Sequence, residues 1–180
     1  METLVREARM SDAEGVARVE VEAWRDTYPT LLPDDYLVKR LDVGRGTVLW
    51  RRRLQGRSRN TLVAAPEDAP KKIAGYATWG RCPLDVPPIG GELYELYLMP
   101  DHQEQGLGRR LCAAVARRLL QSGLSSMSVE VLEGNPARFF YEALGARLAA
   151  RTRHPFAGEV LPAFIYMWDN LPRLAGEVAE

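Results

Sequence analysis

Cysteine is scarce in this sequence, with two residues in 180. Cys82 and Cys112 are too few and too far apart for a disulfide framework or a zinc cluster. We therefore expect neither a disulfide scaffold nor a metal site. Cys112 has apolar neighbours, which favours a small buried core residue over a reactive thiol.

The sequence also lacks an excess of charge of either sign, because 24 Lys and Arg residues balance 24 Asp and Glu residues. A nucleic-acid-binding domain is usually markedly basic, so we expect no nucleic-acid partner. Long hydrophobic runs are absent too. Residues 1–10 have no apolar core of the kind found in signal peptides, and no stretch approaches the roughly 18 apolar residues of a membrane span. These absences predict a cytoplasmic protein without a membrane partner.

What remains is an ordinary globular composition, with 46% hydrophobic and 27% charged residues. The length suffices for one hydrophobic core without staples. We expect a single domain over residues 1–170. Residues 171–180 have no clear core face, and we expect them to form a loosely held tail.

The most informative stretch runs from Gly91 to Leu120. Residues 92–99 alternate in the manner of a strand, which Pro100 ends because proline has no N–H for a strand ladder. A helix is expected to begin near Leu107, where apolar residues then recur every four positions. The strand, turn and helix together form a unit with polar residues and two glycines at its junction.

That junction reads Gln103-Glu104-Gln105-Gly106-Leu107-Gly108. The first amides of a helix lack internal partners and carry the positive end of its dipole, so glycines there would let a phosphate approach the backbone. A tight turn without a ligand is the alternative. A Walker loop is excluded because Arg109 and Arg110 stand where Lys-Ser or Lys-Thr is required. A dinucleotide fingerprint is disfavoured because Leu111 occupies the position of its third glycine.

The other expected elements alternate in type along the chain. The expected strands cover residues 3–9, 60–65, 73–80, 127–132, 147–152 and 161–168. The expected helices are one after a Ser11–Glu14 capping box, one from Pro33 to about Leu41, one over residues 47–54 and one between Asn135 and Gly145. Residues 154–158 are expected in a loop. Arg51, Arg52 and Arg53 are interpreted as a solvated helix face, with an anionic partner as the alternative.

Two blocks resemble the general-control-type N-acetyltransferase (GNAT) superfamily. Gln103-x-x-Gly106-x-Gly108 resembles its acetyl-CoA signature, and residues 135–146 resemble its Asn…Phe-Tyr…Leu-Gly block, with Ala146 in place of an aromatic residue. The resemblance implies an α/β (α+β) GNAT fold, with a mixed, mostly antiparallel sheet of about seven strands and helices on both faces. It also implies acetyl-CoA as co-substrate and the activity of an acyltransferase.

The resemblance assigns roles to individual residues. Tyr141 matches the tyrosine that protonates the departing thiolate, and its alternative role is that of an aromatic packing residue. Glu92 matches a catalytic base, and the alternative is that ordered water takes up the proton. The implied acetyl-CoA contacts are Leu96, Tyr97, Leu98, Gln103, Glu104, Gln105, Gly106, Leu107, Gly108, Arg109, Asn135 and Arg138. Asn135 could instead be only a helix cap, and Arg138 only a surface residue. Glu95, three residues after Glu92, is expected on the other face of the strand unless a bulge intervenes.

The resemblance places the acceptor amine near the first two helices and the last hairpin. The candidate lining residues are Trp24, Tyr28, Tyr36, His154 and Phe156. We expect a small-molecule amine, such as a polyamine or amino compound, as acceptor. The alternatives are a protein amine, either an N-terminus or a lysine, and a sensor that binds acyl-CoA without turnover. A homodimer is also compatible with the resemblance.

Overall fold

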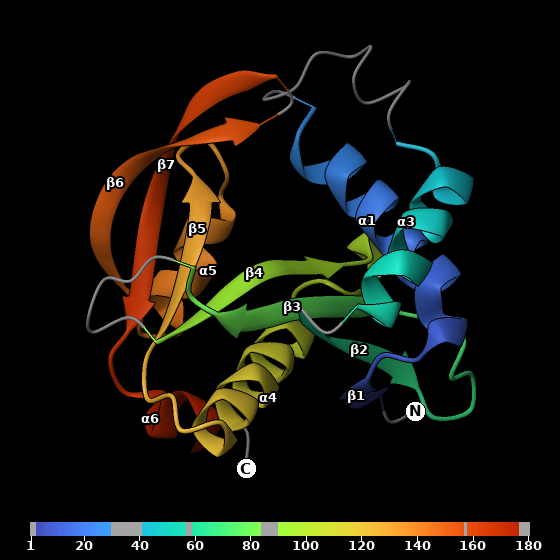
Figure 1. Ribbon diagram of the computed structural model, residues 1–180, viewed down its shortest axis with the longest axis horizontal. Coiled ribbons are helices and arrows are strands. Elements are labelled where there is room, and N and C mark those ends of the chain that lie inside the picture. Colours follow the sequence, from blue (N-terminus) through green and yellow to red (C-terminus); the bar gives the residue numbers. More distant parts are fainter. Residues whose placement is uncertain (1–2, 30–40, 57–58, 84–89, 157, 177–180) are drawn as a thin grey trace. The chain divides into compact units, whose positions relative to one another are not determined.

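The computed structural model describes residues 3–29, 41–56, 59–83, 90–156 and 158–176 (Figure 1). The strands are β1 (Thr3–Glu7), β2 (Asn60–Pro66), β3 (Gly75–Arg81), β4 (Gly91–Leu98), β5 (Met127–Leu132), β6 (Arg147–Phe156) and β7 (Glu159–Trp168). The helices are α1 (Ala13–Thr27), α3 (Val43–Gln55), α4 (Leu107–Gln121), α5 (Ala137–Ala143) and α6 (Leu171–Gly176), with short 3-10 helices η1 (Met10–Asp12) and η2 (Pro100–His102). β1 to β5 each begin and end within two residues of the predicted bounds.

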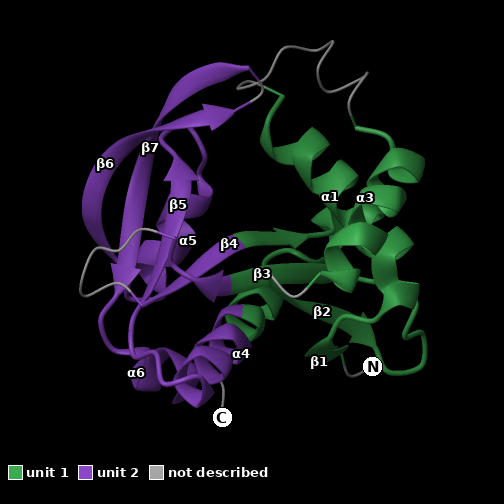
Figure 2. Ribbon diagram, viewed as in Figure 1, with its two compact units in different colours: residues 1–79, 95–111 green, residues 80–94, 112–180 purple. Residues whose placement is uncertain are grey.

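The seven strands form one sheet in the order β1-β2-β3-β4-β5-β7-β6. β1–β2, β2–β3, β5–β7 and β6–β7 are antiparallel, and β4–β5 is parallel. The predicted fold class, a mostly antiparallel sheet of seven strands flanked by helices, is confirmed. The chain divides into two compact units, shown in Figure 2: unit 1 contains residues 1–79 and 95–111, and unit 2 contains residues 80–94 and 112–180. The prediction of a single domain over residues 1–170 stays a prediction.

In unit 1, α1 and α3 cover the strands of the β1–β3 meander. The buried core there includes Val16 of α1, Trp50 of α3, Val63 of β2 and Tyr76 of β3, each at most 1% exposed. Trp50 and Tyr76 meet edge to face, with ring centroids 4.9 Å apart. Burial of this apolar surface, at about 25 cal/mol per Å², is the main term that holds both helices to the sheet.

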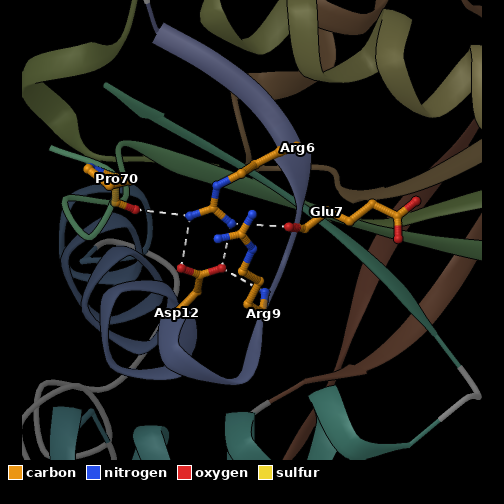
Figure 3. A network of polar contacts seen from close by, with 5 residues as sticks. All are labelled: Arg6, Glu7, Arg9, Asp12 and Pro70. Carbon is orange, nitrogen blue, oxygen red and sulfur yellow. Dashed lines mark hydrogen bonds and ion pairs between the residues drawn. The ribbon is translucent and has the colours of Figure 1, made fainter. Parts of the chain in front are cut away.

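A polar network joins the end of β1 to the start of α1, as Figure 3 shows. Arg6 donates to both carboxylate oxygens of Asp12, at 2.7 and 3.0 Å, and to the carbonyl of Pro70 at 3.0 Å. The amide of Arg9 donates to Asp12 at 2.7 Å. The predicted capping box of Ser11 to Glu14 is therefore wrong. The carboxylate of Asp12 instead accepts from the side chain of Arg6 and the amide of Arg9, and both residues precede the helix.

In unit 2, β5 lies between the first residues of β4 and the long strand β7. Glu92 of β4 is in register with Ser128 of β5. Gly91 faces Leu119 of α4 so closely that an added Cβ would come within 2.6 Å of its side chain. Cys112 of α4 is fully buried, as predicted, and burial raises the pKa of its thiol to about 12.

Two predictions for the C-terminal part are wrong. Residues 154–156 belong to β6 rather than to a loop, and Phe156 is in register with Glu159 across a tight turn at Gly158, whose φ is +90°. The expected tail begins with α6, in which Leu171 and Leu174 are buried. Arg117 of α4 donates to the carbonyl of Ala175 at 2.9 Å, which fastens this helix. The helix predicted from Pro33 to Leu41 falls largely outside the described residues.

None of the helices in the described ranges combines the length and apolar character that crossing a membrane requires.

Candidate functional site

The glycine junction lies in unit 1, between β4 and α4. α4 begins at Leu107, as predicted, and the amide of Arg110 closes its first turn on the carbonyl of Gly106 at 3.1 Å. Glu104 and Gly106 have φ values of +58° and +77°. A Cβ on Gly106 would meet nothing within 4 Å, so glycine is needed there for its backbone conformation and leaves open space.

The side chains of this junction lie on the surface. Gln105 donates to the carbonyl of Asp101 at 2.8 Å, and Gln103 donates to Asp26 of α1 at a long 3.4 Å. Both glutamines, Glu104 and Arg109 are exposed. The start of α4 therefore presents backbone amides and the positive helix dipole to its surroundings, which suits an anion such as a pyrophosphate.

Two of the predicted acceptor residues lie together in unit 1. The rings of Trp24 and Tyr28 are 5.4 Å apart, and the ring of Tyr97 is 6.4 Å from that of Trp24. The hydroxyl groups of Tyr28 and Tyr97 are within hydrogen-bond distance, at 3.1 Å. Tyr28 is only 5% exposed, so it acts mainly as a packing residue at the end of α1. Tyr36, another predicted acceptor residue, lies outside the described residues.

A small pocket lies in unit 1, and we call it the Glu95 pocket. Its volume is about 40 Å³, and its lining residues are Trp50, Arg53, Arg59, Thr61, Thr78 and Glu95. One water needs roughly 10–15 Å³ measured in this way, so the pocket has room for about three. α3, β2, β3 and β4 all contribute to it.

The polar groups of the Glu95 pocket are only partly satisfied. Arg53 Nη1 is 3.4 Å from Glu95 Oε1, and Arg59 Nη1 is 3.9 Å from the same oxygen. The other carboxylate oxygen, Glu95 Oε2, is buried and has no hydrogen-bond partner among the described residues. The hydroxyl of Thr78 also has no hydrogen-bond partner among the described residues, and Thr78 is only 2% exposed.

A second carboxylate, Glu20 of α1, lies behind the Glu95 pocket. Trp50 Nε1 donates to Glu20 Oε2 at 2.7 Å, and Arg53 Nη1 is 3.9 Å from the other oxygen. Burial raises the pKa of Glu20 and outweighs the hydrogen bond from Trp50. Burial also raises the pKa of Tyr76 well above its ordinary value, with the charges of Glu95 and Glu20 adding to the effect.

In unit 2, Tyr141 lies on α5 and is 5% exposed. Its ring packs edge to face against Trp168 of β7, with centroids 5.9 Å apart, and against Phe140 at 5.3 Å. Trp168 donates its Nε1 proton to the carbonyl of Leu144 at 3.0 Å, which fixes the end of α5 against the strand. This packing fixes the position of the Tyr141 ring.

Asn135 and Arg138 lie at the start of the same helix. Asn135 is 7% exposed, and its Oδ1 accepts from the amide of Ala137 at 2.9 Å, a capping interaction made from the residue before Pro136, which is the N-cap of α5. The guanidinium of Arg138 lies over the rings of Phe139 and Phe164, at 4.3 and 5.7 Å. Arg138 is therefore held against aromatic faces rather than extended into solvent.

Three further predicted residues lie in unit 2. Glu92 is half-buried on β4. His154 Nδ1 is 3.2 Å from Glu130 Oε1, and its ring is 6.2 Å from that of Phe156. His154 and Phe156 lie two positions apart on β6, and their role in lining the acceptor path stays a prediction. Glu92 and Glu95 belong to different units, and their expected opposite orientation stays a prediction.

Sequence reasoning missed the Glu95 pocket. Arg51, Arg52 and Arg53 are all exposed, as a solvated face requires, but Arg53 also lines the pocket. The available signal was the spacing of Trp50 and Arg53, three residues apart on a helix and therefore on one face. The guanidinium of Arg53 indeed lies 4.8 Å from the centre of the Trp50 ring.

Comparisons with known proteins agree with this geometry. The sequence model described as the acetyltransferase (GNAT) family matches residues 17–146. The uncharacterized N-acetyltransferase YuaI of Bacillus subtilis (strain 168) is 36% identical over 171 residues, which cover 94% of this chain and 95% of that protein.

Solved structures share the fold at lower identity. A GCN5-related N-acetyltransferase from Rhodopseudomonas palustris superposes with a TM-score of 0.70 at 18% identity, covering 93% of this chain and 95% of the other. The PaiA N-acetyltransferase from Thermoplasma acidophilum, in complex with coenzyme A, gives 0.64 at 17% identity, covering 93% and 98%. Because the family model spans most of the sequence and YuaI nearly all of it, this chain belongs to the acetyltransferase (GNAT) family and is an acetyl-CoA-dependent N-acetyltransferase.

Proposed function

We propose that this enzyme acetylates the primary amine of a small molecule. The Glu95 pocket carries this proposal, since its volume of about 40 Å³ admits a small polar head group. Glu95 directly precedes Leu96 on β4, the first of the residues proposed to hold the acetyl donor. A small acceptor in the pocket would therefore lie beside this strand.

Acetyl-CoA supplies the acetyl group as a thioester. We propose that the backbone of β4 at Leu96, Tyr97 and Leu98 binds the pantetheine arm and polarises the thioester carbonyl. The backbone from Gln103 to Arg109 would hold the pyrophosphate. The open space at Gly106 and the amides at the start of α4 support this assignment.

Tyr141 is the proposed acid, and Asn135 and Arg138 are the proposed further contacts of acetyl-CoA. A phenol with an ordinary pKa near 10 is protonated at neutral pH and can donate its proton to a departing thiolate. The packing of Tyr141 against Trp168 supports the role, because a positioned donor needs a fixed ring. Asn135 accepts from the amide of Ala137 through Oδ1, which fixes its side chain at the start of α5.

Glu92 is the proposed base. A primary amine with a pKa of about 10.4 is almost wholly protonated at pH 7 and must lose a proton before it can attack the thioester. A half-buried carboxylate can accept that proton directly or through water.

The residues proposed to line the path of the acceptor are Trp24, Tyr28, Tyr36, His154 and Phe156. We also propose that the enzyme works in the cytoplasm and that it can form a homodimer.

Calorimetric titration with acetyl-CoA, with NAD and ATP as controls, tests the co-substrate. We expect micromolar binding of acetyl-CoA alone, followed by release of free CoA thiol with one or more members of a panel of small amines. If only peptides with a free N-terminus or a lysine supported thiol release, the acceptor would be a protein and the small-molecule proposal would be wrong.

The role of Tyr141 is tested by Tyr141→Phe, which removes the hydroxyl and keeps the ring. We expect kcat to fall at least about 100-fold, as is typical when a general acid is lost, with the affinity for acetyl-CoA unchanged. Tyr166→Phe is the matched control in the same unit, because it also removes one phenol hydroxyl, which donates to Glu142. An unchanged kcat in Tyr141→Phe would reduce Tyr141 to an aromatic packing residue.

A further inference from the structure

The Glu95 pocket contains unsatisfied acceptors. Glu95 Oε2 is buried without a partner among the described residues, and so is the hydroxyl of Thr78. A buried carboxylate oxygen that lacks a hydrogen bond is unfavourable unless a donor reaches it. Both groups line the same pocket. The missing partner of Glu95 Oε2 is therefore a hydrogen-bond donor, which a ligand ammonium would supply.

The same pocket also contains two arginines whose ion pairs with Glu95 are long. Hydrogen bonds between an arginine and a carboxylate are ordinarily about 2.7–2.9 Å long. Arg53 and Arg59 instead lie 3.4 and 3.9 Å from one oxygen of Glu95. Arg53 is oriented by the Trp50 ring beneath it rather than by a close ion pair. The guanidinium of Arg53, held in this way, can turn its donors toward an incoming carboxylate.

We propose that the Glu95 pocket binds the acceptor as a zwitterion, namely the head group of an α-amino acid. Its carboxylate would lie on Arg53 and Arg59, and its ammonium would donate to Glu95 Oε2 and Thr78. The inference rests on the proposed small-molecule function and narrows the acceptor from amines in general to amino acids. The side chain of the amino acid would extend out of the pocket, because about 40 Å³ holds only the head group.

Other ligand classes fit the same groups less well. A polyamine has no carboxylate, so it would bring further positive charge beside two arginines. An inorganic anion would satisfy the arginines but leave Glu95 Oε2 without a donor and add repulsion. A metal ion would find one carboxylate facing two guanidinium groups, because Glu20 is already bound by Trp50.

Binding is tested on the full chain by ligand-observed NMR, with pools that cover the twenty common L-amino acids. Each amino acid that binds is compared with its α-carboxamide, which keeps the ammonium and loses the negative charge. We expect at least one amino acid to bind, with a Kd at least about tenfold lower than that of its carboxamide, as the loss of a charge-assisted hydrogen bond predicts.

Variants assign that binding to the pocket. The double variant Arg53→Gln/Arg59→Gln is expected to weaken amino-acid binding at least about tenfold and to abolish the preference for acid over carboxamide. Arg53→Lys keeps the charge without the planar fork and is expected to give an intermediate loss. Glu95→Gln should weaken the acid and the carboxamide equally, since both retain the ammonium. Arg52→Gln, on the exposed side of α3, is the matched control and should change nothing.

Turnover separates this inference from the proposed function. The same pools are assayed with acetyl-CoA for release of free thiol, beside spermidine and simple alkylamines. Absence of amino-acid binding, equal binding of acid and carboxamide, or an equal effect of Arg52→Gln would overturn the inference. Faster turnover of alkylamines or spermidine than of any amino acid would overturn it while leaving the proposed function intact. Amino-acid binding that meets every criterion above, without thiol release from any amine, would support the pocket assignment and contradict the proposed function.

Discussion

Unit 1 contains two clusters of arginine and carboxylate that differ in how completely their hydrogen bonds are made. At the start of α1, Arg6 contacts both oxygens of Asp12 at 2.7 and 3.0 Å, and the Arg9 amide adds a third bond. At the Glu95 pocket, Arg53 and Arg59 lie 3.4 and 3.9 Å from one oxygen, and the other oxygen has no partner among the described residues.

The pKa shifts reflect the same difference. Burial alone would raise the pKa of Asp12, but the bonds from Arg6 and Arg9 together with the nearby charges lower it. For Glu20, behind the Glu95 pocket, burial prevails and its pKa is raised. Asp12 accepts three close hydrogen bonds, whereas Glu20 accepts one, from Trp50. The first cluster is therefore structural, and the second is the one that we propose as a binding site.

The largest stability effect is expected from Asp12→Asn. This change removes the charge facing Arg6 in a side chain that is 3% exposed, and we expect the free energy of unfolding to fall by about 2–3 kcal/mol at pH 7. Urea denaturation measures it. The matched control is Asp42→Asn at the start of α3, where asparagine caps as well as aspartate and the change should stay within about 0.5 kcal/mol.

The effect of Asp12→Asn should depend on pH. Because the folded-state pKa of Asp12 is lowered, its contribution is complete above the ordinary value of 3.8 and is lost as the pH falls through the lower folded-state pKa. The difference between wild type and variant should therefore shrink below about pH 4. A difference that stayed constant from pH 7 to pH 3 would contradict the assigned ion pair.

Arg6→Lys should give a smaller effect, a loss of about 1–2 kcal/mol. Lysine keeps the positive charge but cannot donate to both oxygens of Asp12 and to the carbonyl of Pro70 at once. Thermal and urea unfolding of Arg6→Lys and Asp12→Asn, measured together, would compare the stability contributed by the charge with that contributed by the bidentate guanidinium geometry. If both variants were equally unstable, the bidentate geometry would account for the whole contribution.

Glu95→Gln should change stability by less than about 1 kcal/mol, in either direction. The reason is that the lost ion pairs are long and the buried, unpartnered oxygen already weighs against the folded state. The measurement is the same urea denaturation at pH 7. A loss as large as that of Asp12→Asn would show that both clusters are structural and would remove the contrast between them.

The smallest effect is expected from Glu20→Gln, which can still accept a hydrogen bond from Trp50. Because the pKa of Glu20 is raised in the folded state, stability due to its protonated form is present below the ordinary value of 4.5 and is lost as the pH rises through the folded-state pKa. The variant should therefore equal or slightly exceed wild type in stability at pH 7 and match it near pH 4. Lower stability at pH 7 would mean that the partners Arg53 and Trp50 outweigh burial.

The sequence by itself was sufficient for β1 to β5, for α4 and for the family. Alternation marks β4 and β5, the four-residue apolar period marks α4, and Gly106 marks the turn before it, because all three depend on neighbours close along the chain. The Asn135 cap belongs to the same class, since its partner Ala137 is two residues away. Such short-range patterns can be recognised in the sequence because they need no partner from a distant part of the chain.

Only the tertiary structure decided which charged residues have complete hydrogen bonds. Asp12 lies next to Ser11 in an apparent capping box, yet its carboxylate is bound by Arg6, which reaches it from the preceding strand. Arg53 and Glu95 are 42 residues apart, and their meeting depends on how α3 packs over the sheet. The burial of Leu171 and Leu174 depends likewise on packing against distant segments. Local patterns carry no information about the direction of a long side chain, because desolvation and the choice of partner are properties of the packed chain.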